Sequence, residues 1–168
     1  MKINPMNKIL FFISLSFILF SCNDNPIGII YPPDNSYKVT ISQGVWGNVW
    51  FWEGNFMPST DNSSNGKITP VIREIYVYEA TRFDSVEIDT VRYGFIRSIH
   101  SHFIAKINSD NDGFFQITLP VGKYSFFVKE DSLFFANESD GYGYLMSAKV
   151  SQNKVTKRQI NIDYKAAY

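Results

Sequence analysis

The chain has 168 residues, in which 16 basic side chains (Lys and Arg) balance 16 acidic ones, and it contains a single cysteine. This balance, with no basic patch or stripe, argues against nucleic acid as a partner. One cysteine cannot form an internal disulfide, so the folded part must be stabilised by its apolar core. Aromatic residues make up 17% of the chain, a generous supply for packing that core.

Residues 1–21 have the composition of a signal peptide. Two lysines, Lys2 and Lys8, supply positive charge, and the apolar run over residues 9–20 is too short to span a bilayer comfortably. The run ends in Leu19-Phe20-Ser21-Cys22, which resembles a bacterial lipobox. The resemblance implies cleavage before Cys22 and lipid attachment to its sulfur. The alternative is an ordinary signal peptide cut elsewhere, or an uncleaved anchor.

Several acyl chains on Cys22 would hold the protein at a membrane permanently. We therefore expect a lipid-anchored protein of the cell envelope, at the outer membrane, facing the periplasm or the cell surface. Residues 22–40 are rich in Asn, Asp and Pro and lack periodicity, which is typical of a flexible tether. The folded domain is expected over residues 41–168.

The first half of this domain contains three strand regions. Over residues 39–52, two valines and Phe51 alternate with three tryptophans, so the two sets fall on opposite faces. Residues 71–79 are apolar on both faces and suit a central strand. The charged stretch over residues 84–93 indicates an excursion. Alternation returns over residues 95–107, which predicts one strand whose phenylalanines and isoleucines point inward.

The stretch over residues 113–129 is expected to organise the domain, with alternating apolar residues on both sides of a Pro-Val-Gly turn at 120–122. This pattern predicts a hairpin of two half-buried strands. A short strand is expected over residues 133–136, and a last hairpin joins 144–150 to 155–164. Seven or eight short strands without a convincing amphipathic helix predict an all-β fold, a single antiparallel β-sandwich.

Two segments resemble a known family. Gly44 and Gly47 lie in the first strand, Asp112-Gly113-Phe114-Phe115 opens the central pair, and Leu119-Pro120-Val121-Gly122-Lys123-Tyr124 follows. Together they resemble the transthyretin-like, carboxypeptidase-regulatory-like domains. The segment over residues 53–58 and the ending over residues 164–168 also look like those of a group of small envelope lipoproteins from Bacteroidota. The resemblance implies a non-catalytic β-sandwich. Hydrolases of the transthyretin fold use a C-terminal motif that the ending Ala166-Ala167-Tyr168 does not match.

Two small groups have the residue types of metal ligands. His100 and His102 are two residues apart, and two imidazoles at this spacing can share a metal, although a zinc site needs a third ligand. Asp110 and Asp112 lie in a turn that matches the first half of a calcium-binding loop, but Leu119 occupies the position that needs a bidentate Glu. We favour solvated histidines for the first group and an ordinary Asp/Asn/Gly turn for the second, so we expect no cofactor.

Trp46, Trp50 and Trp52 share one face of the first strand, where exposed indoles would form a stacking platform for sugars. A covering loop is the alternative, because large exposed apolar patches are uncommon. The function we expect is therefore a non-catalytic binding or structural module, with envelope proteins or glycans as partners. The alternatives are a glycan-binding module that uses the tryptophan row, and a hydrolase that uses the paired histidines.

Overall fold

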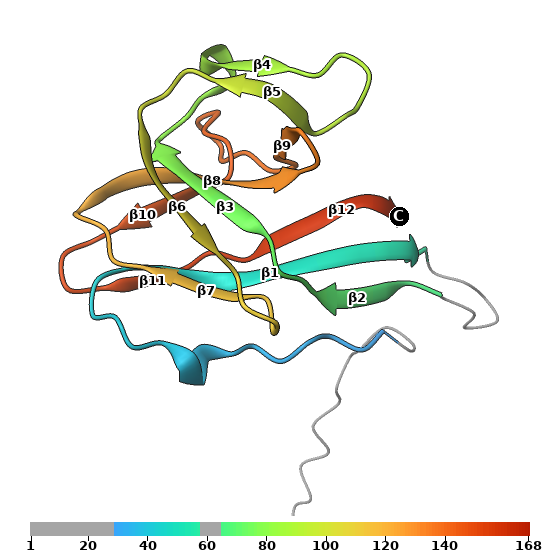
Figure 1. Ribbon diagram of the computed structural model, residues 1–168, viewed down its shortest axis with the longest axis horizontal. Helices are drawn as coiled ribbons and strands as arrows, with labels where there is room; N and C mark the ends of the chain where they lie inside the picture. Colours follow the sequence, from blue (N-terminus) through green and yellow to red (C-terminus); the bar gives the residue numbers. More distant parts are fainter. Residues whose placement is uncertain (1–28, 58–64) are drawn as a thin grey trace, which may run out of the picture.

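The computed structural model describes residues 29–57 and 65–168, which form two β-sheets packed face to face (Figure 1). The fold class expected from the sequence, an all-β sandwich, is confirmed. Within the described residues the only helical elements are two single 3₁₀ turns, η1 (Ser36–Lys38) and η2 (Phe83–Ser85). No helix in this part of the chain is long and apolar enough to cross a membrane.

The first sheet is built on its longest strand, β1 (Gly44–Asn55), which pairs with four others. Two run antiparallel to it along one edge, and two run parallel to it along the other. The antiparallel partners are β2 (Lys67–Pro70) and β7 (Phe114–Ile117), and the parallel partners are β11 (Val155–Lys157) and β12 (Ile160–Ala167). The first strand of the domain is thus hydrogen-bonded directly to its last.

The second sheet has seven strands in the order β4-β5-β9-β8-β3-β6, with β10 paired to a further part of β8. Its pairs are all antiparallel. The strands are β3 (Glu74–Glu79), β4 (Val86–Ile88), β5 (Phe95–Ile99), β6 (Phe103–Asn108), β8 (Gly122–Glu130), β9 (Leu133–Phe135) and β10 (Ser147–Val150). The central position predicted for the strand over residues 71–79 is confirmed, because β3 pairs on both sides.

The predicted hairpin over residues 113–129 is wrong. Strand β7 pairs with β1 in the first sheet, whereas β8 pairs with β3, β9 and β10 in the second. The Pro-Val-Gly turn therefore carries the chain from one sheet to the other. The predicted apolar faces are nonetheless used, because the rings of Phe115 and Phe126 meet across the interior at 6.2 Å. Alternation identified the buried faces but not the partner strands.

Two further connections differ from the predictions. The last two strand regions form no hairpin, because β10 joins the second sheet while β11 and β12 join the first. The predicted single strand over residues 95–107 is broken at residues 100–102, so that β5 and β6 lie far apart in the second sheet. The charged excursion contains the short strand β4, which pairs with β5.

The core lies between the two sheets. A close backbone contact explains the glycine inside β1. The valine face of β1 is fully buried there with Phe115, Phe126 and the isoleucines of β12. At Gly47 the backbone of Arg158, between β11 and β12, passes so close that an added Cβ would be 1.8 Å from its carbonyl oxygen. The Arg158 N–H donates to the carbonyl of Trp46 over 2.7 Å. Only glycine admits this contact.

Candidate functional site

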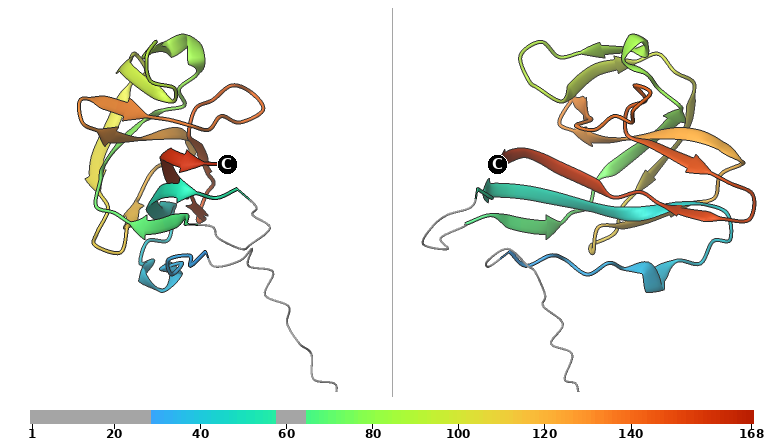
Figure 2. Two further views of the ribbon diagram at one scale, coloured as in Figure 1. Left: turned by 90° about the vertical axis from the view of Figure 1, so that its right-hand side faces the viewer. Right: turned by 180° about the vertical axis from the view of Figure 1, so that it is seen from behind.

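The tryptophan row predicted from the sequence lies on one face of β1, but the N-terminal part of the chain covers it. Residues 29–40 run along the outer side of the first sheet (Figures 1 and 2). The ring of Tyr31 lies 6.5 Å from that of Trp50 and 5.9 Å from that of Trp52. Phe56 contacts Trp52 from the other side at 5.0 Å, and Trp46 is only 9% exposed. The indoles offer no open platform.

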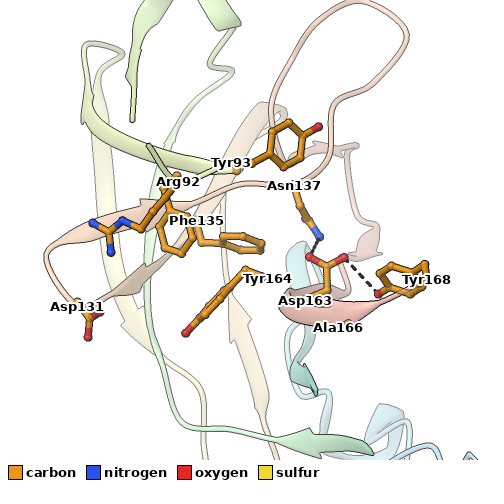
Figure 3. A pocket seen from close by; sticks show the side chains of 11 residues that line it. Arg92, Tyr93, Asp131, Phe135, Asn137, Asp163, Tyr164, Ala166 and Tyr168 are labelled. Carbon is orange, nitrogen blue, oxygen red and sulfur yellow. Dashed lines mark hydrogen bonds between the residues drawn. The ribbon is translucent and has the colours of Figure 1, made fainter. Parts of the chain in front are cut away.

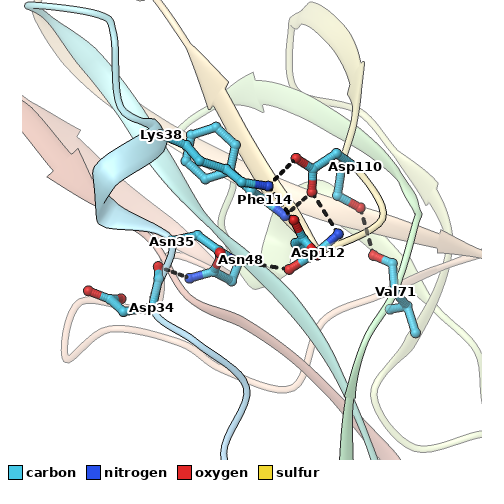
Figure 4. Close-up of polar contacts among 9 residues, drawn as sticks. Asp34, Asn35, Lys38, Asn48, Val71, Asp110, Asp112 and Phe114 are labelled. Atoms are coloured by element: carbon cyan, nitrogen blue, oxygen red, sulfur yellow. Dashed lines mark hydrogen bonds and ion pairs between the residues drawn. The ribbon is translucent and has the colours of Figure 1, made fainter.

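A buried amide pair holds this N-terminal segment in place (Figure 4). Asn35 is 2% exposed, and its Nδ2 donates to Asn48 Oδ1 over 2.9 Å and to the carbonyl of Asp112 over 3.0 Å. Asn48 Nδ2 in turn donates to the carbonyl of Asp34 over 2.9 Å. An ion pair between Asp34 and Lys157 adds a second attachment. Residues 29–40 of the expected tether therefore make specific contacts with the sheet.

The two candidate calcium ligands are held by a lysine. Lys38 Nζ lies 2.8 Å from Asp110 Oδ2 and 2.5 Å from Asp112 Oδ2 (Figure 4). Asp110 Oδ1 also accepts the N–H groups of Asp112 and Phe114, which closes the turn. Partial burial opposes ionisation, but the hydrogen bonds from Lys38 and the backbone lower the pKa of Asp110 below its usual value. The ammonium group thus occupies the position where a cation would bind.

The two histidines lie in the connection between β5 and β6, both exposed to solvent. His100 Nε2 lies 3.3 Å from Glu87 Oε1, on an exposed surface. Across residues 29–57 and 65–168, no three His, Cys, Asp or Glu side chains lie close enough to hold a metal ion. Cys22, the predicted lipidation site, lies outside the described residues.

The feature that the sequence did not indicate is an open cleft of about 570 Å³ at the end of the sandwich where β12 runs out. Its walls come from the loop before β5, from both sides of β9 and from β12 (Figure 3). This volume lies within the roughly 300–1,000 Å³ typical of small-molecule sites. Its lining residues include Arg92, Tyr93, Phe135, Asn137, Asp163 and Tyr168.

The floor of the cleft is a cluster of three aromatic rings. Phe95 and Phe135 are buried with ring centres 5.2 Å apart, and Tyr164 packs edge-to-face on both at 5.2 and 5.6 Å. The Tyr164 hydroxyl donates to Glu130 over 2.9 Å. Partial burial and this carboxylate raise the pKa of Tyr164 to about 12, so its phenol stays neutral at physiological pH. The floor is therefore rigid, apolar and uncharged.

One rim of the cleft carries a hydrogen-bonded group of polar side chains (Figure 3). Asn137 Nδ2 donates to Asp163 Oδ1 over 2.8 Å and to the carbonyl of Asn161 over 3.2 Å. The hydroxyl of Tyr168 donates to Asp163 Oδ2 over 3.3 Å. Partial burial of this hydroxyl and the charge of Asp163 raise the pKa of Tyr168 to about 12. The Tyr168 ring itself remains largely exposed.

The opposite rim is a loop that one carboxylate holds in shape. Asp89 accepts the backbone N–H groups of Val91 and Arg92, over 2.9 and 2.8 Å, and the Nε–H of Arg97 over 3.1 Å. The backbone bond from Arg92, the Arg97 side chain and the bond from Val91 together lower the pKa of Asp89 to about 2. This loop presents Tyr93, which is 95% exposed.

A second cleft of about 350 Å³ lies on the other side of Tyr93. Its lining includes Phe83, Ile88 and Val91, three apolar side chains that are at least half exposed. Tyr93 and Asn137 line both clefts, so the loop before β5 forms a ridge between them. This end of the molecule therefore exposes more aromatic and apolar surface than the charged stretch over residues 84–93 predicts.

The cleft residues come from three separate parts of the chain, around residues 92–95, 131–137 and 163–168. Only the sheet order brings these parts together, because β5 pairs with β9 while β12 lies in the facing sheet. No spacing within the sequence links them. The nearest local signal is Asp89 ahead of Val91 and Arg92, a pattern typical of a carboxylate-capped turn.

Taken together, the fold and the cleft define an all-β, sandwich-like protein with a preformed aromatic cleft at one end. Comparisons with protein-family models, with curated proteins and with solved structures found no match to this chain. The arguments about function therefore depend on the residues themselves.

Proposed function

We propose that this chain is a lipid-anchored binding module of a bacterial cell envelope. The lipobox-like Leu19-Phe20-Ser21-Cys22 supports the anchor, and the first 21 residues have signal-peptide composition. Two packed β-sheets and the Asp112-Gly113-Phe114 turn support a transthyretin-like, carboxypeptidase-regulatory-like domain. The outer membrane is the proposed location, with the domain facing the periplasm or the cell surface.

The single observation that carries a binding role is the cleft bounded by Tyr93 and Tyr168. Exposed aromatic rings beside a concave apolar floor are costly in water and typical of ligand sites. The floor is fixed by edge-to-face packing, and the rim by the hydrogen bonds of Asp89 and Asp163. A site whose shape exists before binding loses little conformational entropy when a ligand enters.

Binding fits this geometry better than hydrolysis does. A hydrolase that uses His100 or His102 needs its base beside a pocket, and neither histidine lines either of the two clefts described above. The exposed pair formed by His100 and Glu87 instead faces solvent. A glycan site on the tryptophan row would first require the N-terminal segment to leave β1.

The anchor is tested by labelling cells with a palmitate analogue. The expected result is a labelled, membrane-bound wild-type protein and no label on Cys22→Ala, because the thiol is the proposed attachment point. A Cys22→Ala protein that still carries label would overturn the assignment of the anchor to this residue.

The binding role is tested by nitrating tyrosines in intact cells and in the purified full chain, followed by mass spectrometry. A ligand in the cleft should slow nitration of Tyr93 in cells at least threefold. Tyr142, which is 77% exposed and far from the cleft lining, serves as the matched control and should react equally in both samples. Equal reactivity of Tyr93 in cells and in isolation would contradict the proposed function.

A further inference from the structure

The two most exposed rings of the cleft offer flat apolar surface on its rim. Tyr93 is 95% exposed and Tyr168 is 65% exposed. Each such ring can bury on the order of 150–250 Å² of surface when a partner covers it. Tyr168 is held by its hydroxyl bond to Asp163 and by stacking on Phe56 at 5.8 Å, so the ring face away from Phe56 is the open one, whereas Tyr93 is placed through the backbone of the Asp89-capped loop. A ligand that covers them must therefore have flat, apolar faces of its own.

The polar pair between these rings mainly offers hydrogen-bond acceptors (Figure 3). The Nδ2 of Asn137 already donates to Asp163 and to the carbonyl of Asn161, which fixes the amide with its Oδ1 as the unused acceptor. A carboxylate has about four acceptor positions, and Asp163 uses two of them on Asn137 and Tyr168. The matching ligand supplies several hydroxyl donors at short spacing.

The charges around the cleft argue against anionic ligands. Among its lining residues Arg92 is the cation and Asp131 and Asp163 are the anions, so a phosphate or carboxylate would meet a net negative site. Arg92 lies 4.9 Å over the ring of Phe95 and Lys165 lies 5.9 Å from that of Tyr164, so the protein's own cations already cover these two rings. An organic cation would have to stack on Tyr93 and Tyr168, and competition with tetramethylammonium separates it from a sugar.

We infer that the cleft binds a neutral saccharide chain. A pyranose ring combines a flat face of C–H groups, which packs on an aromatic ring, with hydroxyls that donate and accept at its edge. In this arrangement sugar rings cover Tyr168 and Tyr93 while their hydroxyls donate to Asn137 Oδ1 and Asp163. The guanidinium of Arg92 donates to a hydroxyl or ring oxygen. The inference rests on the proposed binding function and names its ligand class.

The test uses the lipidated full chain in detergent and a polysaccharide fraction prepared from the cell envelope. Nitration of Tyr93 is measured with the fraction untreated, treated with periodate, which cleaves vicinal diols, or treated with protease. The inference predicts protection by the untreated and protease-treated fractions, at least threefold, and its loss after periodate. Neutral gluco-, galacto- and manno-oligosaccharides then identify the sugar by competition.

Single-residue variants test which side chains contact the saccharide. Asn137→Ala and Tyr93→Ala are expected to weaken retention on immobilised envelope polysaccharide at least tenfold. Tyr142→Ala, which changes an exposed tyrosine outside the cleft lining, should leave retention unchanged. Thermal melting of each variant shows that the fold is intact. Should Asn137→Ala unfold the protein, Tyr93→Ala still decides, because that side chain is almost entirely exposed.

The possible outcomes separate the ligand class from the binding function. Protection that survives periodate and disappears with protease means that the partner is a protein, which overturns the saccharide but keeps the cleft as a binding site. Protection abolished by tetramethylammonium but not by sugars also overturns the saccharide. If no envelope fraction protects Tyr93, and Tyr93 also reacts equally in cells, both proposals fail.

Discussion

The molecule has two aromatic surfaces that differ in what covers them. The tryptophans on the outer face of β1 are closed by the chain's own residues 29–40, through Tyr31 and the buried Asn35. The tyrosines of the cleft at the end of β12 are open to solvent and held apart by polar side chains. Both regions are rich in aromatic residues. The packed surface differs from the proposed binding surface in that another segment of the chain covers it.

The most severe way to break this comparison is to disrupt β1, which carries the tryptophans and pairs with β12, one wall of the cleft. Gly47→Val would place side-chain atoms on the Arg158 carbonyl, 1.8 Å from the added Cβ, and separate β1 from the end of β11. We expect a loss of about 3 kcal/mol or more of unfolding free energy, measured by chemical denaturation. Gly141→Val, where an added Cβ meets nothing within 4 Å, is the control and should cost far less.

Removing an indole tests whether the tryptophan face is part of the packing. Trp50→Ala should cost about 2 kcal/mol, less than the roughly 3–5 kcal/mol of a fully buried aromatic, because the side chain is half-buried beneath Tyr31. Retention on envelope polysaccharide should stay at the wild-type level. If Trp50→Ala abolished retention while the fold stayed intact, the tryptophan row rather than the cleft would be the binding surface.

Loosening the N-terminal segment should open the tryptophan face. Asn35→Ala leaves Asn48 and the Asp112 carbonyl without a buried partner, so we expect a loss of about 1–3 kcal/mol. Tryptophan fluorescence should shift to longer wavelength as water reaches Trp50 and Trp52. Tyr37→Ala, an exposed side chain in the same segment, should leave the spectrum as it is.

Acid should loosen the rim of the cleft through Asp89. Its pKa is lowered from 3.8 to about 2 in the folded protein, so its stabilisation is complete above pH 4 and is lost as the pH falls through 2. Hydrogen exchange of the Val91 and Arg92 amides, corrected for the intrinsic rate, should lose protection over this range. An Asp89→Asn protein that showed the same pH profile would refute the assignment to this carboxylate.

The smallest effect on stability is expected at the cleft itself. Tyr93→Ala should change the unfolding free energy by no more than about 0.5 kcal/mol, because its side chain is almost entirely exposed. The same change should reduce polysaccharide retention at least tenfold. A large loss of stability would mean that Tyr93 packs against the fold rather than serving a ligand.

The sequence predicted which faces are buried better than which strands are neighbours. Alternation placed Phe115 and Phe126 inward, and both lie in the core; it separated Val45 from the tryptophans without deciding which of the two faces is the interior one. It also predicted a hairpin at residues 113–129, which is wrong. A period-2 pattern shows which face of a strand is buried, but it carries no information about which strand lies beside it. The cleft could not be predicted, since residues such as Tyr93 and Asp163 meet only through this sheet order.

The segment that covers the tryptophans was harder to predict from the sequence than the buried faces of the strands. A row of indoles on one strand face favours a covering segment, because large exposed apolar patches are uncommon. Residues 29–40 were expected to be tether because Pro, Asn and Asp interrupt any periodicity there. Their contacts instead depend on single residues, chiefly Tyr31, Asn35 and Lys38, and isolated contacts of this kind leave no pattern.

The parallel pairing of β1 with β11 and β12 affects the order and the rate of folding. Residues 44–55 hydrogen-bond to residues 155–167, so the first sheet cannot close until nearly the whole chain is available. Contacts this distant in sequence are formed late and slowly, because loop closure must precede them. A polypeptide with this topology stays open while its front end emerges from a ribosome or a translocation channel, and it locks only when the tail arrives.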